Sequence, residues 1–518
     1  MKYIPSSQQY TEAIMRQYGV NSLMAKVIEA KKLNKADFIK ITNPRLVYHD
    51  FDEFSEAELV IDRIQEAIED HEKICIYGDY DCDGMLATAI LVQAFKELGV
   101  EVGYHIPNRF EDGYGLNVSR VEQMAEKGYT LIITVDNGIK AFDAVKRANE
   151  LGVDVIITDH HGLDENGDLP DACSIIHTAV SIDYPFKDIC GGFIAYKLAA
   201  KLLGHHDKYL YALAAVTTIS DMMPLIDENR SVVVHGLRFM REGQYPQLSL
   251  LMGDNQDYSV STIGYSIAPK INSFGRLPEY VNPNNVVRYF LKDAPQQLLT
   301  QLSSKAIEIN NTRQSMTRSQ YQLALEQPHD EFLYYGDESL HEGIIGLIAG
   351  RYSHEFYRPA FVMHYDEDKH LYKGSARGVQ GFSIKDFFVE NSDLLENYGG
   401  HELAGGFSVS RRHYSQLERR IKHAITNKSF EETKTVIEIT PDDLSIDSVE
   451  SLNLLAPFGQ GNEAPVFKID DIHVDQLRQL SGGKHLRIDC SGDNVRFAAL
   501  YFAHGDLYDE LNKQKALT

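Results

Sequence analysis

The sequence predicts an α/β chain whose main domain contains a parallel sheet flanked by helices. Three short apolar runs, at residues 74–77, 130–135 and 153–158, are each followed by acidic residues and are separated by helical patterns. This alternation of strand and helix is typical of βαβ units, whose strands run parallel. At 518 residues the chain is also too long for one ordinary domain. The predicted parts are an N-terminal lead-in at residues 1–50, a first α/β domain at 51–225, a helical connector at 226–330, a second α/β domain at 331–430 and a β domain at 431–518.

The composition argues against several classes of protein. The net charge of −24 speaks against a general coat for nucleic acid, although it allows a channel with local positive charge and bound metals. Five cysteines without paired CxxC spacing indicate neither a disulfide framework nor a zinc ribbon. The sequence has no run of about 18 apolar residues and no apolar N-terminal segment. We therefore expect a soluble, cytoplasmic protein that does not bind membranes.

The first apolar run ends at three carboxylates, Asp79, Asp81 and Asp83. A helical pattern over residues 85–95 follows, so this stretch predicts a strand, a tight loop and a helix. Ligands collect at the carboxyl ends of such strands, and crowded carboxylates repel one another unless a cation lies among them. The spacing also fits the opening of an EF-hand calcium loop, but that loop needs a glutamate where this chain has Ile90. A solvated acidic turn is a further alternative for this stretch taken alone.

Further candidate ligands follow the other strands. Asp136 comes after the second run, the triplet Asp159-His160-His161 follows the third, and Asp221 ends a later apolar segment. A single aspartate at such a position often only caps the next helix. Acids at several strand ends favour a shared metal site instead, because the carboxyl ends of parallel strands meet at one edge. Carboxylates with one imidazole suit two Mn²⁺ or Mg²⁺ ions, which activate water for attack on a phosphoryl group.

Residues 108–115 predict a loop that carries an arginine and a glycine-flanked aromatic side chain. Arg109 suits a contact with phosphate, and Tyr114 suits a base or sugar face. A glycine-rich turn with a surface arginine explains the same residues equally well.

These motifs resemble the DHH phosphoesterase superfamily. The resemblance rests on the carboxylates at 79–83, the triplet at 159–161 and the segment 220–225. Within the superfamily the chain is most similar, over nearly its whole length, to RecJ, a family of bacterial single-strand-specific 5′ to 3′ DNA exonucleases. The resemblance implies that Asp136 bridges two ions. The implied ligands are Asp79, Asp81 and Asp136 for one ion, and Asp83, Asp136, His160 and Asp221 for the other.

The resemblance also implies catalytic and substrate-binding roles. With Asp136, the implied catalytic residues are His161, which would stabilise charge at the scissile phosphate, and Asp159, which would support the histidines. Residues 268–277 are similar to a RecJ motif in which Arg276 would reach the 5′ end; without the family, a plain spacer helix with a capping loop is an alternative for this region. Ser375, Arg377 and His401 lie in glycine-rich turns that match a DHHA1 domain. The implied substrate contacts are Arg109, Tyr114, Asn272, Arg276, Ser375, Arg377 and His401.

Residues 455–467 are similar to the entry of an OB fold that grips single strands. Lys484, His485 and Arg487 are interleaved with apolar residues there, as in a groove-facing strand or in an edge strand with solvated basic side chains. The family's OB fold normally continues past residue 518, and many relatives carry a further domain. We therefore expect an incomplete OB fold or a truncated form.

The predicted fold is thus a DHH domain, a helical connector, a DHHA1 domain and an OB-fold domain. The resemblance implies a monomeric exonuclease for recombination and repair that acts on single-stranded DNA beside a RecQ-type helicase and a single-strand-binding protein. Two alternatives stay open: a nanoRNase or small-nucleotide phosphatase with the same metal core, and a non-catalytic replication subunit that binds single-stranded DNA.

Overall fold

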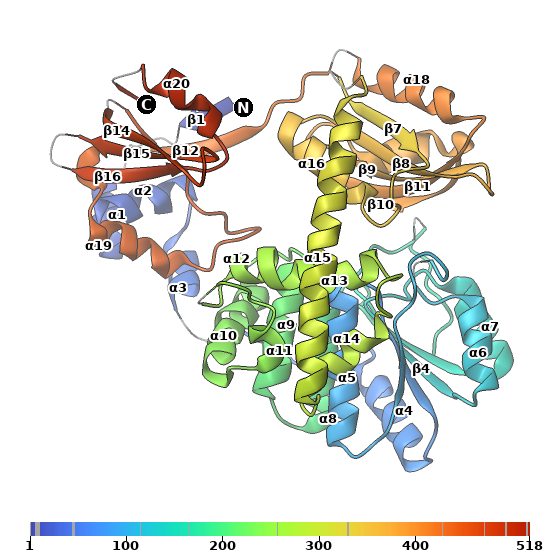
Figure 1. The fold of residues 1–518 in the computed structure, drawn as a ribbon. Helices are drawn as coiled ribbons and strands as arrows, with labels where there is room; N and C mark the ends of the chain where they lie inside the picture. The colour runs from blue at the N-terminus through green and yellow to red at the C-terminus, as the bar shows by residue number, and fades with distance from the viewer. Residues whose placement is uncertain are drawn as a thin grey trace. The chain divides into compact units, whose positions relative to one another are not determined.

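The computed structural model describes residues 2–5, 11–43, 47–113, 115–164, 166–255, 257–328, 331–426, 428–470, 472–492, 495–513 and 516–517. These residues form two compact units, which are described separately. The larger unit covers residues 46–430, and the smaller combines residues 1–45 with residues 431–518. Figure 1 shows the larger unit as two α/β domains joined by the long helix α15.

The first domain of the larger unit is built on a parallel sheet. Its strand order is β3-β2-β4-β5-β6. Side chains alternate between the two faces: Ile76, Ile133 and Ile156 face one core, while Cys75 and Ile157 face the other. Both faces are buried, which explains why these strands read as continuous apolar runs. The strands are β2 (Ile74–Tyr77), β3 (Gly103–His105), β4 (Leu131–Val135), β5 (Asp154–Thr158) and β6 (Ser174–Ile176).

Helices cover both faces of this sheet. One core contains residues of η1 (Phe51–Glu53), α4 (Ala57–Glu69), α5 (Cys82–Glu97), α8 (Gly191–Leu203) and α9 (Lys208–Ser220). The other core contains residues of α6 (Val118–Glu126) and α7 (Phe142–Leu151). α5 is buried along nearly its whole length and therefore forms the centre of the domain.

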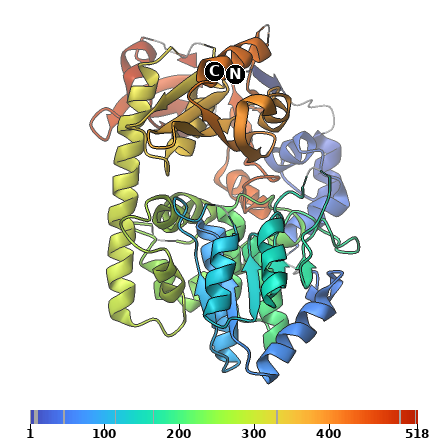
Figure 2. The same ribbon diagram turned by 90° about the vertical axis from the view of Figure 1, so that its right-hand side faces the viewer.

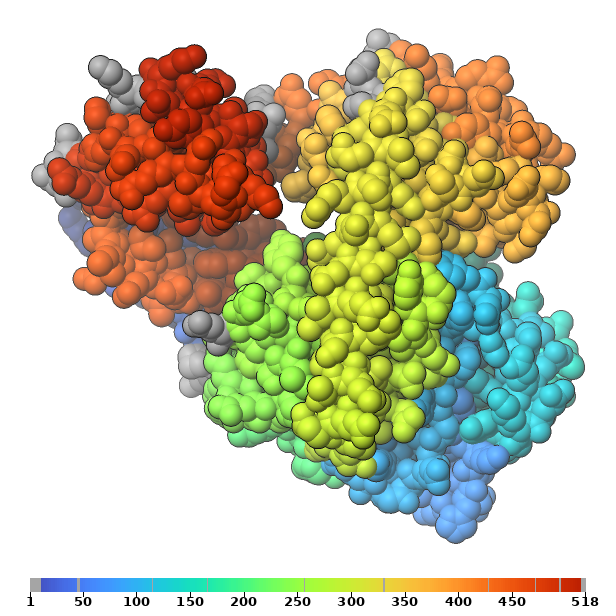
Figure 3. Space-filling view, in the orientation of Figure 1, coloured from blue at the N-terminus to red at the C-terminus, as the bar shows by residue number. Residues whose placement is uncertain are grey.

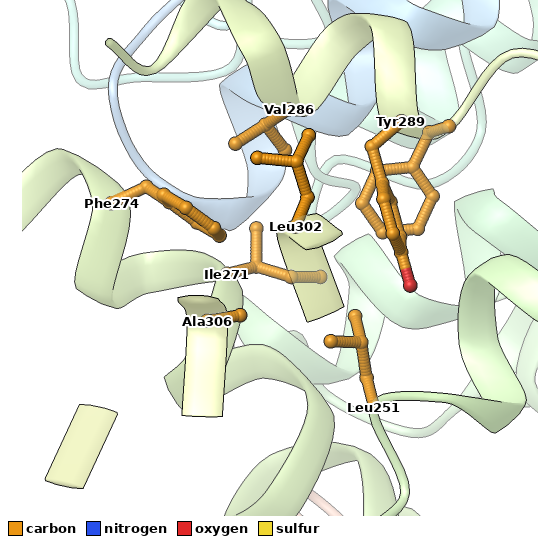
Figure 4. A pocket seen from close by; sticks show the side chains of 8 residues that line it. Leu251, Ile271, Phe274, Val286, Tyr289, Leu302 and Ala306 are labelled. Carbon is orange, nitrogen blue, oxygen red and sulfur yellow. The ribbon is translucent and has the colours of Figure 1, made fainter. Parts of the chain in front are cut away.

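A helical segment follows, as the sequence predicts. Helices α12, η2 and α13 run without a break from residue 260 to residue 276, and η2 is a π-helical turn. A small apolar cavity lies under α13, lined by Ile271, Phe274 and residues of α14 and α15 (Figure 4). The elements are α10 (Asp227–Gly243), α11 (Pro246–Ser249), α12 (Val260–Thr262), η2 (Ile263–Ile267), α13 (Ala268–Arg276), α14 (Asn284–Tyr289) and α15 (Gln296–Leu325).

α15 links the two domains of the larger unit. Leu299, Ala306 and Ile309 pack in the core of the first domain, whereas Tyr321 and Ala324 pack in a core of the second. Figure 2 shows this helix running from one domain to the other, and Figure 3 shows that one of its sides is exposed over much of its length.

The second domain has a mixed sheet with the strand order β10-β11-β9-β8-β7, in which only β7 and β8 pair in parallel. Phe361, Phe388 and Phe407 fill its core. The elements are β7 (Leu333–Asp337), α16 (Ile345–Phe356), β8 (Ala360–Asp366), β9 (Leu371–Arg377), α17 (Ile384–Glu390), η3 (Ser392–Leu394), β10 (Leu395–Gly400), β11 (Ala404–Ser410) and α18 (Tyr414–Ile425).

The smaller unit joins the two ends of the chain. It contains the sheets β1-β12-β13 and β16-β15-β14-β17, in which β1 pairs in parallel with β12. Leu23 and Val27 share a core with Ile437 and Leu455. Its elements are β1 (Lys2–Pro5), α1 (Thr11–Tyr18), α2 (Ser22–Ala30), α3 (Lys35–Thr42), β12 (Thr433–Ile439), η4 (Pro441–Asp443), α19 (Ile446–Ser451), η5 (Leu452–Leu455), β13 (Phe467–Ile469), β14 (Ile472–Leu480), β15 (His485–Ser491), β16 (Arg496–Tyr501), η6 (Gly505–Leu507), α20 (Tyr508–Leu511) and β17 (Ala516–Leu517).

Residues 11–43 are therefore more than part of the lead-in that the sequence suggests, because they complete the core of the C-terminal module. Lys26 Nζ lies 2.6 Å from Asp443 Oδ2, and both side chains are largely buried. Within the part of the chain that the structure describes, no helix is long and apolar enough to span a bilayer.

Candidate metal centre

The predicted ligands meet at the carboxyl edge of the parallel sheet. Asp79, Asp81 and Asp83 occupy the turn from β2 into α5, where Asp81 caps the helix by accepting a hydrogen bond from Gly84 N at 3.0 Å. Asp136 directly follows β4 and has a φ of 63°, a left-handed conformation that few non-glycine residues adopt. Such backbone outliers concentrate at functional sites, where the surrounding structure enforces them.

His160 lies among the carboxylates. Its Nε2 atom is 3.0 Å from Asp136 Oδ1, 3.6 Å from Asp221 Oδ2 and 3.8 Å from Asp83 Oδ2. Donor atoms within 4.8 Å of one another form three sets at this edge, and the sets overlap at Asp136 and His160. They are Asp79 with Asp81 and Asp136, Asp83 with His160 and Asp221, and Asp136 with His160 and His161.

The donor set fits two divalent cations. Four of its buried atoms have no hydrogen-bond partner among the described residues: Asp79 Oδ1, Asp136 Oδ1, His160 Nε2 and Asp221 Oδ2. Burial and the neighbouring Asp81 raise the pKa of Asp79 to about 8, and burial with Asp83 nearby raises the pKa of Asp136 well above its usual value. Burial and the charge of His161 lower the pKa of His160 to about 3, so its imidazole is held neutral, the form that binds metal. Bound cations would relieve the repulsion between the carboxylates and would supply partners for these four atoms.

The N-terminus of α8 supports this site. The sequence motifs do not predict this role of α8. Gly191 N and Gly192 N each donate a hydrogen bond of 2.8 Å to Asp83, one to each carboxylate oxygen. A Cβ atom on Gly191 would lie 2.5 Å from Asp136 Cβ, so only glycine lets the helix approach so closely. The signal in the sequence is a glycine pair that opens an apolar helical run.

Asp159 and His177 fix the loop that carries the two histidines. Asp159 Oδ1 accepts hydrogen bonds from His160 N, His161 N and His161 Nδ1, the last at 2.8 Å. Burial alone would lower the pKa of His161, but the hydrogen bond to Asp159 and the negative charges of Asp159, Asp79 and Asp221 together outweigh it and raise that pKa to about 9. His177 follows β6, donates from Nε2 to His161 O at 2.8 Å and accepts from Ala179 N at Nδ1. The His161 ring is therefore held in position as a cation.

Four arginines gather beside the carboxylates. The pKa of Arg276 falls to about 9 because of burial and the charges of Arg109, Arg313 and Arg377. Arg276 Nη1 donates to Gly343 O at 3.3 Å, and Arg377 Nη1 donates to Ser375 Oγ at 3.1 Å. Within the described residues, none of the four forms a salt bridge with a carboxylate. Clustered cations without acidic partners form a site for an anion such as phosphate.

The other predicted substrate contacts have different surroundings. Asn272 Oδ1 accepts a hydrogen bond from Cys82 N at 2.8 Å, so its oxygen holds the carboxylate-bearing turn. His401 Cε1 lies 3.7 Å from where a Cβ on Gly162 would stand, which puts this second-domain side chain beside the histidine loop. Tyr114 lies outside the described residues. The substrate roles of all these residues stay predictions.

Comparison with known proteins decides the family. Three domain models match: the DHH family N-terminal domain at residues 73–219, the DHHA1 domain at 329–427 and the RecJ OB domain at 437–518. The single-stranded-DNA-specific exonuclease RecJ of Dickeya dadantii is 30% identical over 475 residues, which cover 83% of this chain and 80% of that protein. The chain belongs to the RecJ family. The predicted family and the predicted fold of DHH, DHHA1 and OB domains are confirmed.

Two further RecJ proteins extend the comparison. RecJ of Bacillus subtilis is 31% identical over 97% of this chain, but the chain spans 65% of the length of that relative. A crystal structure of RecJ in complex with Mn²⁺ from Thermus thermophilus superposes with a TM-score of 0.80 at 26% identity, over 96% of this chain and 73% of that one.

Proposed function

We propose that this RecJ-family chain is a metal-dependent exonuclease that removes nucleotides from the 5′ end of single-stranded DNA. The observation that carries the proposal is that a site suited to cations lies next to a site suited to an anion. Buried carboxylates with unpartnered oxygen atoms converge at the sheet edge. Four arginines without acidic partners among the described residues gather next to them. The first site suits Mn²⁺ or Mg²⁺, and the second suits a terminal phosphate.

The metal ligands would be those that the family resemblance implies, with Asp136 shared between two ions. Bound at this edge, two divalent ions polarise the phosphoryl group and provide a hydroxide at neutral pH. The hydrogen bonds from Gly191 N and Gly192 N to Asp83 leave that carboxylate little freedom, so it is oriented before an ion binds.

His161 is the residue that would meet the scissile phosphate. Its Nδ1 is held by Asp159 at 2.8 Å, so Nε2 is the nitrogen that would donate to a phosphate oxygen. An imidazolium there stabilises the charge that develops on the phosphoryl oxygens in the transition state. Asp159 acts through His161, as a positioning residue.

The arginine cluster would determine the end of the strand from which nucleotides are removed. Arg276 and Arg377 come from the two α/β domains of the larger unit, and Arg276 already contacts the second domain through Gly343 O. A 5′ phosphate seated among these guanidinium groups would place the next phosphate along the strand at the metal edge. Removal of mononucleotides from the 5′ end follows from that arrangement.

The smaller unit offers a surface for the rest of the strand. Arg478 pairs across the sheet with Arg487, and Arg487 pairs with Leu500, all on the exposed side of β14, β15 and β16. Leu500 is 51% exposed and Phe502 63% exposed. Basic and apolar side chains side by side suit a backbone with unstacked bases. Asp489 contacts both arginines, which moderates their positive charge.

The test is digestion of a single-stranded oligonucleotide of about 30 nucleotides, labelled in parallel at either end, a length that exceeds one OB-fold footprint. Early release of the 5′ label with Mn²⁺, a shrinking ladder from the 3′ label, and arrest by chelator or by Asp136→Asn are the expected results. Preference for a dinucleotide would favour the nanoRNase or nucleotide-phosphatase alternative. Absence of Mn²⁺ binding in calorimetry would favour the non-catalytic subunit.

The proposal includes a cellular role. A 5′ to 3′ exonuclease for single strands needs an unwound substrate, so we place this chain in recombination and repair with a RecQ-type helicase and a single-strand-binding protein. A monomer suffices, because every proposed ligand comes from one chain. Co-purification with such a helicase and stimulation of digestion by it are the measurements that check this role.

A further inference from the structure

Tyr265 is an aromatic side chain that the fold leaves in solvent. It is 86% exposed, whereas Tyr280, Tyr398 and Tyr501 are at most 44% exposed. Within the described part of the chain its ring has no aromatic neighbour and its hydroxyl no hydrogen bond. A core role is therefore excluded, and the ring is accessible to a binding partner.

The backbone beneath Tyr265 is unusual and firmly held. Tyr265 is the middle residue of η2, the π-helical turn between α12 and α13. Such turns are rare and occur often at functional sites. The next residue, Ser266, donates to Met252 O at 2.8 Å and accepts a hydrogen bond from the buried Lys270 at 2.8 Å. Lys270 also donates to Leu251 O at 2.6 Å, so the turn presents Tyr265 from a rigid base.

The turn η2 packs against α9, the helix capped by the proposed ligand Asp221, and carries Tyr265. A Cβ on its neighbour Gly264 would be 4.0 Å from Ile219 Cγ2, and Ile219 precedes the proposed ligand Asp221 by two residues. Met222, the residue after Asp221, is 68% exposed. The exposed side chains of Tyr265 and Met222 thus both belong to segments that border the proposed metal ligand Asp221.

The same continuous helix carries the proposed 5′ phosphate site. Eleven residues separate Tyr265 from Arg276, which is about 16 Å along the axis at about 1.5 Å per residue. A strand spaced between about 3.4 Å per nucleotide, as in a duplex, and about twice that value needs roughly three to five nucleotides to cover this length. Figure 1 shows α12 and α13 following one another at the same end of the domain.

We propose that Tyr265 is a stacking platform for a base of single-stranded DNA, a few nucleotides to the 3′ side of the scissile phosphate. The inference rests on the proposed function and adds a residue that selects for substrate length. A dinucleotide is too short to reach Tyr265, whereas a longer strand gains a stacking contact. Stacking is tolerant of sequence because every base has an aromatic face, so no base preference is expected.

The kinetic test compares Tyr265→Ala with Tyr265→Phe on 5′-phosphorylated oligothymidylates. For a strand of about 12 nucleotides, Tyr265→Ala should raise KM about tenfold and leave kcat within about twofold, because base stacking on an aromatic ring is worth that much binding. Tyr265→Phe keeps the ring and should match the wild type. Leu59→Ala, a change at an exposed residue of α4, controls for a loss of activity that any exposed apolar substitution would cause. Equal losses on the dinucleotide and the long strand, or no loss on the long strand, would overturn the proposal.

A binding test separates this proposal from the nuclease activity. Oligonucleotides carrying one 2-aminopurine at successive positions from the 5′ end are titrated with the full chain in Ca²⁺ or chelator. Fluorescence quenching at one internal position, retained in Tyr265→Phe and lost in Tyr265→Ala, is the expected result. If the wild type binds and quenches without cutting DNA, the proposed function fails and the stacking role stands. Unchanged quenching in Tyr265→Ala refutes the stacking role whether or not DNA is cut.

Discussion

Replacement of Gly191 by alanine should disable the metal centre while leaving most of the fold intact. The added Cβ would stand 2.5 Å from Asp136 Cβ, 2.7 Å from Asp136 Oδ1 and 2.8 Å from Asp136 Cα. Ordinary carbon contacts are about 3.5–4.0 Å, so α8 and Asp136 must separate by about 1 Å. The Asp136 backbone cannot easily yield, because it is already in the left-handed region with a φ of 63°.

The expected loss of Mn²⁺ affinity follows from the two carboxylates that α8 positions, Asp83 and Asp136. A shift of about 1 Å stretches the 2.8 Å hydrogen bonds from Gly191 N and Gly192 N to Asp83, and hydrogen bonds to a charged group are worth about 1.5–3 kcal/mol each. Loss of such support for metal ligands typically weakens metal binding about 10–100-fold. We therefore expect the Kd for Mn²⁺ to rise by about that factor, with a parallel loss of nuclease activity at limiting Mn²⁺.

Calorimetric titration with Mn²⁺, alongside thermal unfolding, is the assay. Gly236→Ala in α10 is the control, because its Cβ would clash with Ala215 Cβ of α9 and with no residue of the metal centre. That variant should lower Tm and change Mn²⁺ affinity much less than Gly191→Ala. If Gly191→Ala bound Mn²⁺ as tightly as the wild type, the reasoning that α8 positions Asp83 and Asp136 would be wrong.

Other predictions concern the buried charges. Lys197 and Glu228 form a fully buried pair at 2.7 Å, so Lys197→Met should cost about 3–5 kcal/mol in the free energy of unfolding, and the added change Glu228→Gln should restore part of it in urea titrations. Asp159→Asn should keep Mn²⁺ binding within about tenfold of the wild type but lower kcat about 10²-fold or more, because His161 loses the carboxylate that holds it charged. An unchanged kcat would contradict that role. Asp443 has a pKa below its usual value, since the hydrogen bonds from Lys26, Thr440 N and Ser22 together outweigh the opposing effect of burial. Its stabilisation is present above the unfolded pKa of about 3.9 and is lost as the pH falls through the folded value, so Asp443→Asn should remove this acid dependence from the unfolding curve of the full chain.

Much of the larger unit follows from local sequence patterns. The strands β2, β4 and β5 are buried on both faces, so each appears as an uninterrupted apolar run, and the acids that follow them had to meet at one sheet edge. Asn34 caps α3 by accepting a hydrogen bond from Asp37 N, three residues away. In these cases the determining interactions lie within a few residues, or the topology of a parallel sheet brings the residues together.

What the sequence could not reveal depends on contacts between distant segments. Gly191 matters because α8 approaches Asp136, and nothing in the local pattern measures that approach. β1 pairs with β12, more than 400 residues later, so the local sequence indicates only a lead-in, although the first helices share a core with Ile437. Such pairings depend on loop closure and on the complementarity of complete surfaces, which no short motif encodes.

The placement of Asn272 and Arg276 on α13 gives these distant contacts a functional meaning. The two residues are four apart, so they lie on one face of the helix. Asn272 Oδ1 fixes the turn that carries Asp79, Asp81 and Asp83 through Cys82 N, while Arg276 belongs to the arginine cluster. One rigid turn of helix therefore sets the spacing between a site for cations and a site for an anion. With a terminal phosphate at the second site, the distance to the first is constant for every strand, whatever its sequence. On the proposed function, a site built in this way would measure out one nucleotide from the 5′ end.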